Sequence, residues 1–329
     1  MIVLTLAIPR PKSGFLWWRI NHRVVGHPMT PTPRTPAPSV PDVRRPGAAV
    51  PLAVWLVGQT SAAEQWADRY LPGSADQPAS ITPELARRIV VEYSQPGELI
   101  LDPCCGAGAT LVEAATRGRR AIGVETQDSW ARLAVANCQH SLARDAWPLV
   151  EVITGDPRRL ADLVGAHCGQ VDLAVLCPPA GANLDSSPPG AQRRLAPSTA
   201  PDTPTDKVVR PQHGDVSRDA AGELIAACAQ VLRPGGLLVT VTGNTHNPGR
   251  LIDRAGNTVA AAQAAGLDYL QHIVAVHAVV RDSALAAPLC ASTGETGDAS
   301  GPASRRHLVV HRDVLVFRQR ADPTLGRAG

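Results

Sequence analysis

Short apolar runs alternate with amphipathic stretches along most of the chain after residue 82. The runs predict buried strands at 98–102, 121–125, 150–154, 171–176 and 237–242. The stretches between them have the apolar spacing of helices, at about 109–117, 129–143, 220–232 and 250–265. Because strands and helices alternate, we expect a parallel sheet with right-handed crossover connections.

The two ends of this pattern differ from its middle. Thr82-Pro83-Glu84 predicts the start of a further helix, with a capping hydroxyl, a proline in the first turn and then an acid. At the other end, strands at 269–280 and 307–318 follow one another without a helix between them, which indicates one antiparallel pair at the sheet edge. The predicted fold class is therefore α/β, with a Rossmann-like sheet that is mostly parallel and has one antiparallel edge strand.

One domain accounts for residues 52–319, and segments poor in apolar residues flank and interrupt it. Residues 1–51 are dense in proline and predict a disordered tail, and residues 320–329 predict another. Two insertions are expected, at about 181–215 and 281–304. The arginines of the first insertion could touch phosphates, but neighbouring aspartates nearly cancel their charge, so a disordered loop is the preferred interpretation.

Composition narrows the function classes only slightly. With 32 Lys and Arg against 29 Asp and Glu, the formal net charge of +3 permits a nucleic-acid partner without arguing for one. The seven cysteines form no Cys-x-x-Cys pair and no Cys/His cluster at zinc-ligand spacing, so no metal site is expected. Unpaired thiols and the lack of an uncharged segment of spanning length predict a cytoplasmic protein without a membrane partner.

Candidate chemistry begins at the turn after the strand at 98–102. Asp102 ends that strand, and Gly106 and Gly108 allow a tight turn at the carboxyl edge of the sheet, where open α/β folds bind ligands. Glu125 ends the next strand, about 20 residues further on, at the spacing from which a carboxylate reaches ribose hydroxyls. A dinucleotide is the competing ligand. However, Asp102 would repel a pyrophosphate, whereas it suits the ammonium group of S-adenosylmethionine.

Residues Leu101 to Ala114 resemble the first motif of the amino-group DNA methyltransferases, which modify adenine N6 or cytosine N4. The resemblance extends over about 54–317, and the order of the motifs is also similar to that of RNA guanine-N2 methylases. It implies a class I methyltransferase fold with S-adenosylmethionine as the cofactor. The turn and the resemblance together give as cofactor-binding residues Asp102, Cys104, Gly106, Gly108, Glu125 and Asp156.

The catalytic motif of that family ends its fourth strand, and the counterpart here is Cys177-Pro178-Pro179-Ala180. In the family, a polar side chain and a proline carbonyl accept the hydrogens of the base amine, and an aromatic residue stacks on the flipped base. Pro178 keeps its carbonyl, but Cys177 is a weak acceptor and Ala180 cannot stack. Because stacking contributes roughly 1–3 kcal/mol per base, its loss weakens base capture on the order of ten- to hundredfold.

Three functions stay open on the sequence. The first is an S-adenosylmethionine-dependent methyltransferase of an exocyclic amino group in nucleic acid, with DNA favoured over RNA and residues 177–180 as the catalytic segment. The second is a homologue that binds the cofactor but has lost base chemistry. The third is a methyltransferase of RNA or of a small molecule for which the shortened side chain at Ala180 makes room. The sequence indicates neither a target base nor an oligomeric state.

Overall fold

The computed structural model describes residues 52–67, 69–77, 81–178, 193–195, 218–247, 250–281, 284–286 and 309–321. The predicted N-terminal tail at 1–51 lies outside the described residues. So do all but a few residues of the two predicted insertions and of the C-terminal tail.

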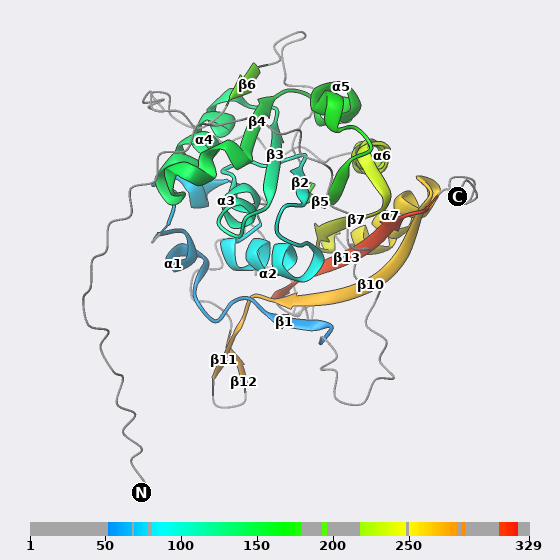
Figure 1. The fold of residues 1–329 in the computed structure, drawn as a ribbon. Helices are drawn as coiled ribbons and strands as arrows, with labels where there is room; N and C mark the ends of the chain where they lie inside the picture. Colours follow the sequence, from blue (N-terminus) through cyan, green and yellow to red (C-terminus); the bar gives the residue numbers. More distant parts are fainter. Residues whose placement is uncertain are drawn as a thin grey trace, which may run out of the picture. The chain divides into compact units, whose positions relative to one another are not determined.

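A nine-stranded sheet forms the centre of the described part, in the order β1-β10-β13-β7-β5-β2-β3-β4-β6 (Figure 1). The strands are β1 (Val54–Leu56), β2 (Leu99–Asp102), β3 (Arg120–Glu125), β4 (Val150–Thr154), β5 (Val171–Leu176), β6 (Arg193–Leu195), β7 (Leu232–Thr242), β10 (Leu267–Val276) and β13 (His311–Gln319). Strand β13 runs antiparallel to both of its neighbours, β10 and β7, and β6 runs antiparallel to β4. The other pairs are parallel, so the predicted Rossmann-like sheet is confirmed, with its antiparallel pair formed by the last two long strands.

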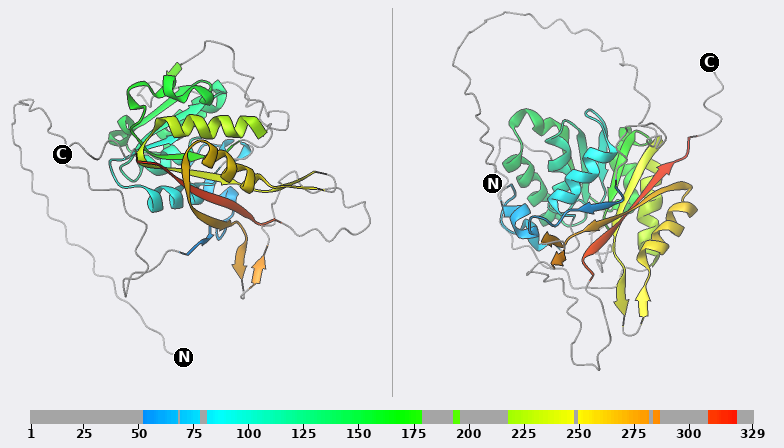
Figure 2. Two further views of the ribbon diagram at one scale, coloured as in Figure 1. Left: turned by 90° about the vertical axis from the view of Figure 1, so that its right-hand side faces the viewer. Right: turned by 90° about the horizontal axis from the view of Figure 1, so that it is seen from below.

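Helices cover both faces of this sheet (Figure 2). They are α1 (Ala62–Ala67), α2 (Pro83–Tyr93), α3 (Ala109–Ala115), α4 (Asp128–Ser141), α5 (Leu160–Val164), α6 (Arg218–Val231) and α7 (Arg254–Ala264). Short 3-10 turns are η1 (Ser74–Asp76), η2 (Arg144–Leu149), η3 (Pro157–Arg159) and η4 (Gly165–His167). One apolar core joins α2, α3 and α4 to one face, and a second core joins α5, α6 and α7 to the other, as expected of alternating strands and helices.

Helix α2 begins where the sequence predicts, but its cap is different. Pro83 occupies the first helical position and Glu84 follows in the first turn. The predicted capping role of Thr82 is wrong, because its buried hydroxyl oxygen has no hydrogen-bond partner. The Gln65 side-chain oxygen, from α1, accepts the Glu84 amide hydrogen instead, at 3.1 Å. The free amide at the start of α2 is thus bonded by a residue 19 positions away in the sequence. Local sequence rules assign this role to Thr82.

The segments between the main strands hold five short strands that the sequence pattern does not predict as separate elements. Within the first insertion, Arg193–Leu195 pairs with β4, so a disordered loop is the wrong interpretation for these three residues. The predicted helix at 250–265 begins four residues later, because β9 (Arg250–Ile252) pairs with β8 (Thr245–Asn247) before α7 starts. The predicted strand at 269–280 ends at Val276, and β11 (Val279–Arg281) then forms a hairpin with β12 (Ala284–Ala286).

Candidate donor and acceptor site

The turn between β2 and α3 has the backbone geometry that its glycines permit. Gly106 and Gly108 have positive φ angles of 50° and 85°, in a region that other residues rarely occupy. The Cys105 amide donates to the Val124 carbonyl at 3.0 Å, and the Gly108 amide donates to the Cys105 carbonyl at 2.8 Å. One hydrogen bond therefore holds the turn against β3, and the other closes the turn before α3 begins.

Glu125, at the end of β3, supports this turn. One carboxylate oxygen accepts the Gly106 amide hydrogen at 3.0 Å, and the other accepts from the Gln127 amide at 2.9 Å. The residue is buried, and burial raises the pKa of its carboxyl group. The Thr126 hydroxyl also donates to the oxygen bonded by Gln127, at 3.2 Å, so the oxygen that accepts from Gly106 is the one with capacity for a ligand hydroxyl.

Asp102 is a buried acid without a cation. It is 4% exposed, and burial raises the pKa of its carboxyl group to about 6. Its Oδ1 atom accepts the Cys104 amide hydrogen at 3.1 Å, and the Thr110 hydroxyl also forms a hydrogen bond with it. Within the described ranges no Lys, Arg or His forms an ion pair with Asp102. Such a carboxylate fits the ammonium group of a methionine moiety, which would supply the missing positive charge.

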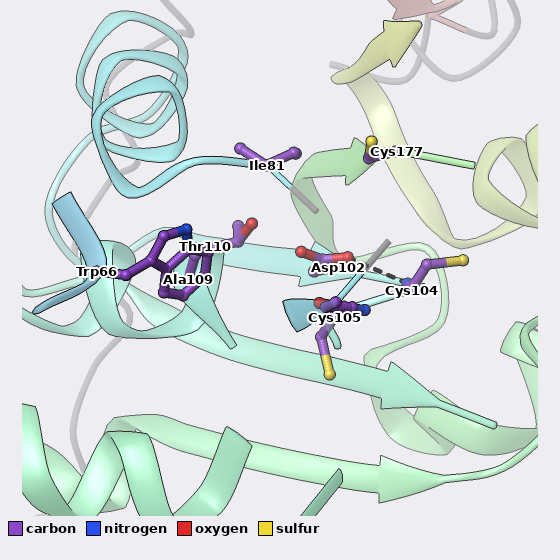
Figure 3. A pocket seen from close by; sticks show the side chains of 9 residues that line it. Trp66, Ile81, Asp102, Cys104, Cys105, Ala109, Thr110 and Cys177 are labelled. Atoms are coloured by element: carbon purple, nitrogen blue, oxygen red, sulfur yellow. Dashed lines mark hydrogen bonds between the residues drawn. The ribbon is translucent and has the colours of Figure 1, made fainter. Parts of the chain in front are cut away.

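Asp102 lines a cavity of about 270 Å³, a volume that includes the cavity's open side (Figure 3). The residues that line it are Trp66, Gln77, Ile81, Asp102, Cys104, Cys105, Ala109, Thr110 and Cys177. The structure thus brings together Asp102 and Cys104 from the predicted donor site and Cys177 from the predicted catalytic segment. The buried Asp102 carboxylate in its lining suits this cavity to the ammonium group of S-adenosylmethionine.

Gln77 covers the glycine turn from outside the sheet. Its side-chain oxygen accepts the Ala107 amide hydrogen at 3.0 Å. A Cβ atom placed on Gly106 would lie 1.7 Å from the Gln77 amide nitrogen, so a larger residue there would displace the Gln77 side chain. The positive φ angle of Gly106 also favours glycine at this position.

Asp156, the predicted partner of the adenine amine, lies apart from the residues that line the cavity. It caps η3, and its Oδ1 atom accepts the Arg158 amide hydrogen at 2.9 Å. Its Oδ2 atom also forms an ion pair with the Arg158 guanidinium at 2.8 Å. These contacts with Arg158 outweigh the effect of burial and lower the pKa of the Asp156 carboxyl. Contact between Asp156 and a cofactor stays a prediction.

Three cysteines gather where β2 and β5 end. Cys104 and Cys105 belong to the turn and Cys177 follows β5, and burial raises the pKa of each thiol, for Cys177 to about 11. All three are therefore neutral at pH 7, as expected of small packing residues in place of reactive thiolates. Pro178 is half-buried beside Cys177, whereas Pro179 and Ala180 lie outside the described residues.

The cavity contains an aromatic ring that the sequence analysis missed. Trp66, from α1, is 5% exposed and contacts the ring of Tyr70 edge-on, with 4.7 Å between centroids. No aromatic residue occurs between Trp147 and Tyr269, so the search around the catalytic segment gave none. Trp66 lies more than 100 positions before Cys177, in a helix of six residues that is too short to show a period.

No group of three or more His, Cys, Asp or Glu side chains in the described ranges could hold a metal ion. No helix in the same ranges has the length and apolar character needed to cross a membrane.

Comparison with known proteins agrees with this geometry. A family model described as DNA methylase matches residues 27–136, which include the glycine turn and Glu125. The type II methyltransferase M2.DpnII of Streptococcus pneumoniae is 32% identical over 81 residues, covering 25% of this chain and 28% of that protein. A tRNA (guanine(10)-N2)-dimethyltransferase of Methanothermobacter thermautotrophicus is 34% identical over 113 residues, covering 33% of this chain and 30% of that protein.

The chain thus spans less than a third of the length of either relative. Among solved structures, TrmN from Thermus thermophilus aligns with 78% of this chain and 53% of its own, at 16% identity and a TM-score of 0.45. The glycine turn, the buried acid at Asp102 and the matched family model together lead to one conclusion. Over residues 27–136 the chain is similar to the amino-group DNA methyltransferases, and its cofactor is S-adenosylmethionine.

Proposed function

We propose that this chain is a cytoplasmic, S-adenosylmethionine-dependent methyltransferase that acts on an exocyclic amino group of a nucleic-acid base, in DNA rather than RNA. One observation carries the proposal: Asp102 and Cys177, at the ends of β2 and β5, line the same cavity. An acid suited to the donor and the first residue of the acceptor segment therefore share one space. Direct transfer between two bound groups requires such proximity.

On the donor side, three acids would each contact a different part of the cofactor. Asp102 would hold the ammonium group, Glu125 the ribose hydroxyls and Asp156 the adenine amine. When bound, S-adenosylmethionine supplies an electrophilic methyl group on its sulfonium sulfur. Gly106 and Gly108 let a ligand approach the backbone closely, because neither carries a side chain.

On the acceptor side, the chain's own residues would orient the base amine. The Pro178 carbonyl accepts one amine hydrogen, which turns the nitrogen lone pair toward the donor. Cys177 keeps its proton at pH 7, since burial raises its pKa to about 11, and its sulfur is only a weak acceptor. Trp66 adds an aromatic wall to the same cavity. Slow catalysis is expected, because Pro178 provides the one strong acceptor and Ala180 offers no stacking surface.

Two measurements test the proposal in order. Titration calorimetry with S-adenosylhomocysteine tests the donor site, and a folded protein that binds none contradicts the proposal at its first step. Transfer of labelled methyl groups to mixed DNA and to mixed RNA then tests the acceptor. Label in DNA is the expected result. Cofactor binding without label in either nucleic acid would identify a homologue that has lost base chemistry.

RNA is the second candidate acceptor, because one specific observation favours it. The matched tRNA (guanine(10)-N2)-dimethyltransferase is as similar to this chain as the type II methyltransferase is, at 34% against 32% identity. Both relatives are named as methyltransferases, and one of them is named for tRNA. Label that appears in RNA and not in DNA would decide for this candidate.

A further inference from the structure

Arg312, near the start of β13, lies at the carboxyl edge of the parallel strands. The register pairs Asp313 with Thr242 at the end of β7, so Arg312 is opposite Gly243. A Cβ atom on Gly243 would lie 3.2 Å from the Arg312 Nη1 atom and 3.4 Å from its Cδ atom. The Arg312 side chain therefore passes over Gly243, at a place where a larger residue would obstruct it.

The alternation along the strands puts Arg312 on the same face as the donor cavity. Val314 and Val316 belong to the core formed with α2, α3 and α4, and Arg312 precedes them by an even number of residues. Cys177 packs against the same core from the end of β5. Arg312 is also near enough to Cys177 for its charge to lower the pKa of the thiol, although burial of the thiol has the larger effect.

Arg312 has no anionic partner among the residues that the structure describes. The nearest acid on its own strand, Asp313, faces the other side of the sheet and bonds to His272 at 2.8 Å. Cys177 is a neutral thiol and so cannot balance the charge. Arg312 is half-buried, and a guanidinium in that position without an anion carries an uncompensated desolvation cost.

A second polar group beside Arg312 also lacks a partner. His277, just after β10, has a buried Nε2 atom without a hydrogen-bond partner in the described structure. Burial and the charges of Arg312 and His311 lower the pKa of the His277 ring to about 4, so the ring is neutral at pH 7. A neutral imidazole can donate one N–H. The Arg312 guanidinium and the His277 Nε2 atom, from adjacent strands, thus lie next to each other at the carboxyl edge of the sheet. Neither has a partner in the described structure.

We propose that Arg312 and His277 form a binding site for a phosphate group of the acceptor, adjacent to Cys177. Arginine presents N–H groups in a fork that matches two phosphate oxygens, and a neutral histidine N–H would add a third donor. The site would bind the phosphate backbone of the nucleic-acid strand whose base reaches the donor cavity. It rests on the proposed function in taking nucleic acid as the acceptor, and it adds a specific contact to that function.

The first experiment compares Arg312→Gln with the natural chain. Each is titrated, with S-adenosylhomocysteine present, with a short single-stranded DNA and with the same DNA carrying an uncharged methylphosphonate backbone. Arg312→Gln is expected to weaken binding of the phosphodiester DNA by about tenfold, as for a charge-assisted hydrogen bond, and to leave the uncharged DNA unaffected. The slope of log affinity against log salt is expected to become shallower by about 0.7. Arg320→Gln, an exposed arginine at the other end of β13, is the matched control and should change neither value.

A second probe separates this inference from the proposed function. Inorganic phosphate is titrated into the natural chain, Arg312→Gln and Arg312→Lys, with unchanged S-adenosylhomocysteine binding as proof that each variant folds. Phosphate binding that is lost in Arg312→Gln supports the site even if no nucleic acid binds, in which case only the proposed acceptor fails. Phosphodiester DNA that binds equally well to Arg312→Gln overturns the inference and leaves the proposed function standing. Failure of the natural chain to bind either probe overturns both.

Discussion

At the scale of single residues, we expect Asp102 to couple cofactor binding to pH. Burial raises the pKa of its carboxyl group to about 6, so the group takes up a proton as the pH falls below that value. Only the ionised form attracts an ammonium group. Affinity for S-adenosylhomocysteine is therefore expected to be constant above pH 7 and to fall by up to about tenfold per pH unit below pH 6. Calorimetry from pH 5 to pH 8 measures this.

Without ligand, the free energy of unfolding depends on pH in the opposite direction. Because the folded-state pKa lies above the ordinary value of 3.8, the unfolded chain releases the Asp102 proton first. This residue therefore lowers the free energy of unfolding as the pH rises from about 4 to 6.

Asp102→Asn should weaken cofactor binding at pH 8 by about ten- to hundredfold and flatten the pH profile. Asp162→Asn, an exposed partner of Arg159, is the control, and equal affinity in Asp102→Asn would contradict the assigned role.

Also at the residue scale, the proposed catalytic segment lacks two side chains that the amino-group DNA methyltransferases use. The double change Cys177→Ser with Ala180→Tyr restores a hydroxyl acceptor and a stacking ring. We expect it to raise methyl transfer to nucleic acid by about ten- to hundredfold, since base stacking contributes roughly 1–3 kcal/mol. Labelled-methyl incorporation measures the change, with Cys168→Ser, an exposed cysteine, as the control. An unchanged rate would mean that nucleic acid is not the acceptor or that another residue limits the reaction.

At the scale of elements, the start of α2 offers a comparison between two caps. Gln65 supplies the hydrogen bond to the Glu84 amide, while the buried Thr82 hydroxyl has no partner. Gln65→Ala should therefore lower the free energy of unfolding by about 1–2 kcal/mol, the usual cost of losing a cap. Thr82→Ala should change it by less than about 0.5 kcal/mol, because no hydrogen bond is lost. Urea denaturation measures both, and a larger loss for Thr82→Ala than for Gln65→Ala would contradict this assignment.

The same comparison shows what a sequence pattern can predict about elements. Strands 150–154 and 171–176 begin and end as predicted, because most of their residues are apolar and buried. The start of α7 and the three-residue strand β6 were missed, because three-residue pairings leave no period to detect. The cap of α2 was assigned to the wrong residue, since Gln65 reaches it only through the tertiary fold.

At the scale of the whole molecule, the donor site was more predictable than the acceptor site. Asp102, Gly106 and Glu125 lie within one strand-turn-helix-strand unit, so local motifs identify them. Trp66 and Arg312 come from the two ends of the chain, and no spacing rule links either of them to Cys177. Only the order of the strands, which puts β13 beside β7, brings Arg312 to the acceptor edge.

The charge of the whole chain leads to a last prediction. Its 32 basic residues are opposed by 29 acids, and several described arginines are held in ion pairs, among them Arg69, Arg117 and Arg233. Among the residues that the structure describes, Arg312 is a cation outside these ion pairs and at the carboxyl edge of the sheet. Because each neutralised phosphate contributes about 0.7 to the log–log salt slope of single-strand binding, we expect a slope between about −1 and −2. Fluorescence anisotropy of a labelled oligonucleotide from 50 to 300 mM salt would measure it. A slope near −5 would contradict this expectation and would require a basic surface formed by other arginines, such as those between residues 181 and 215.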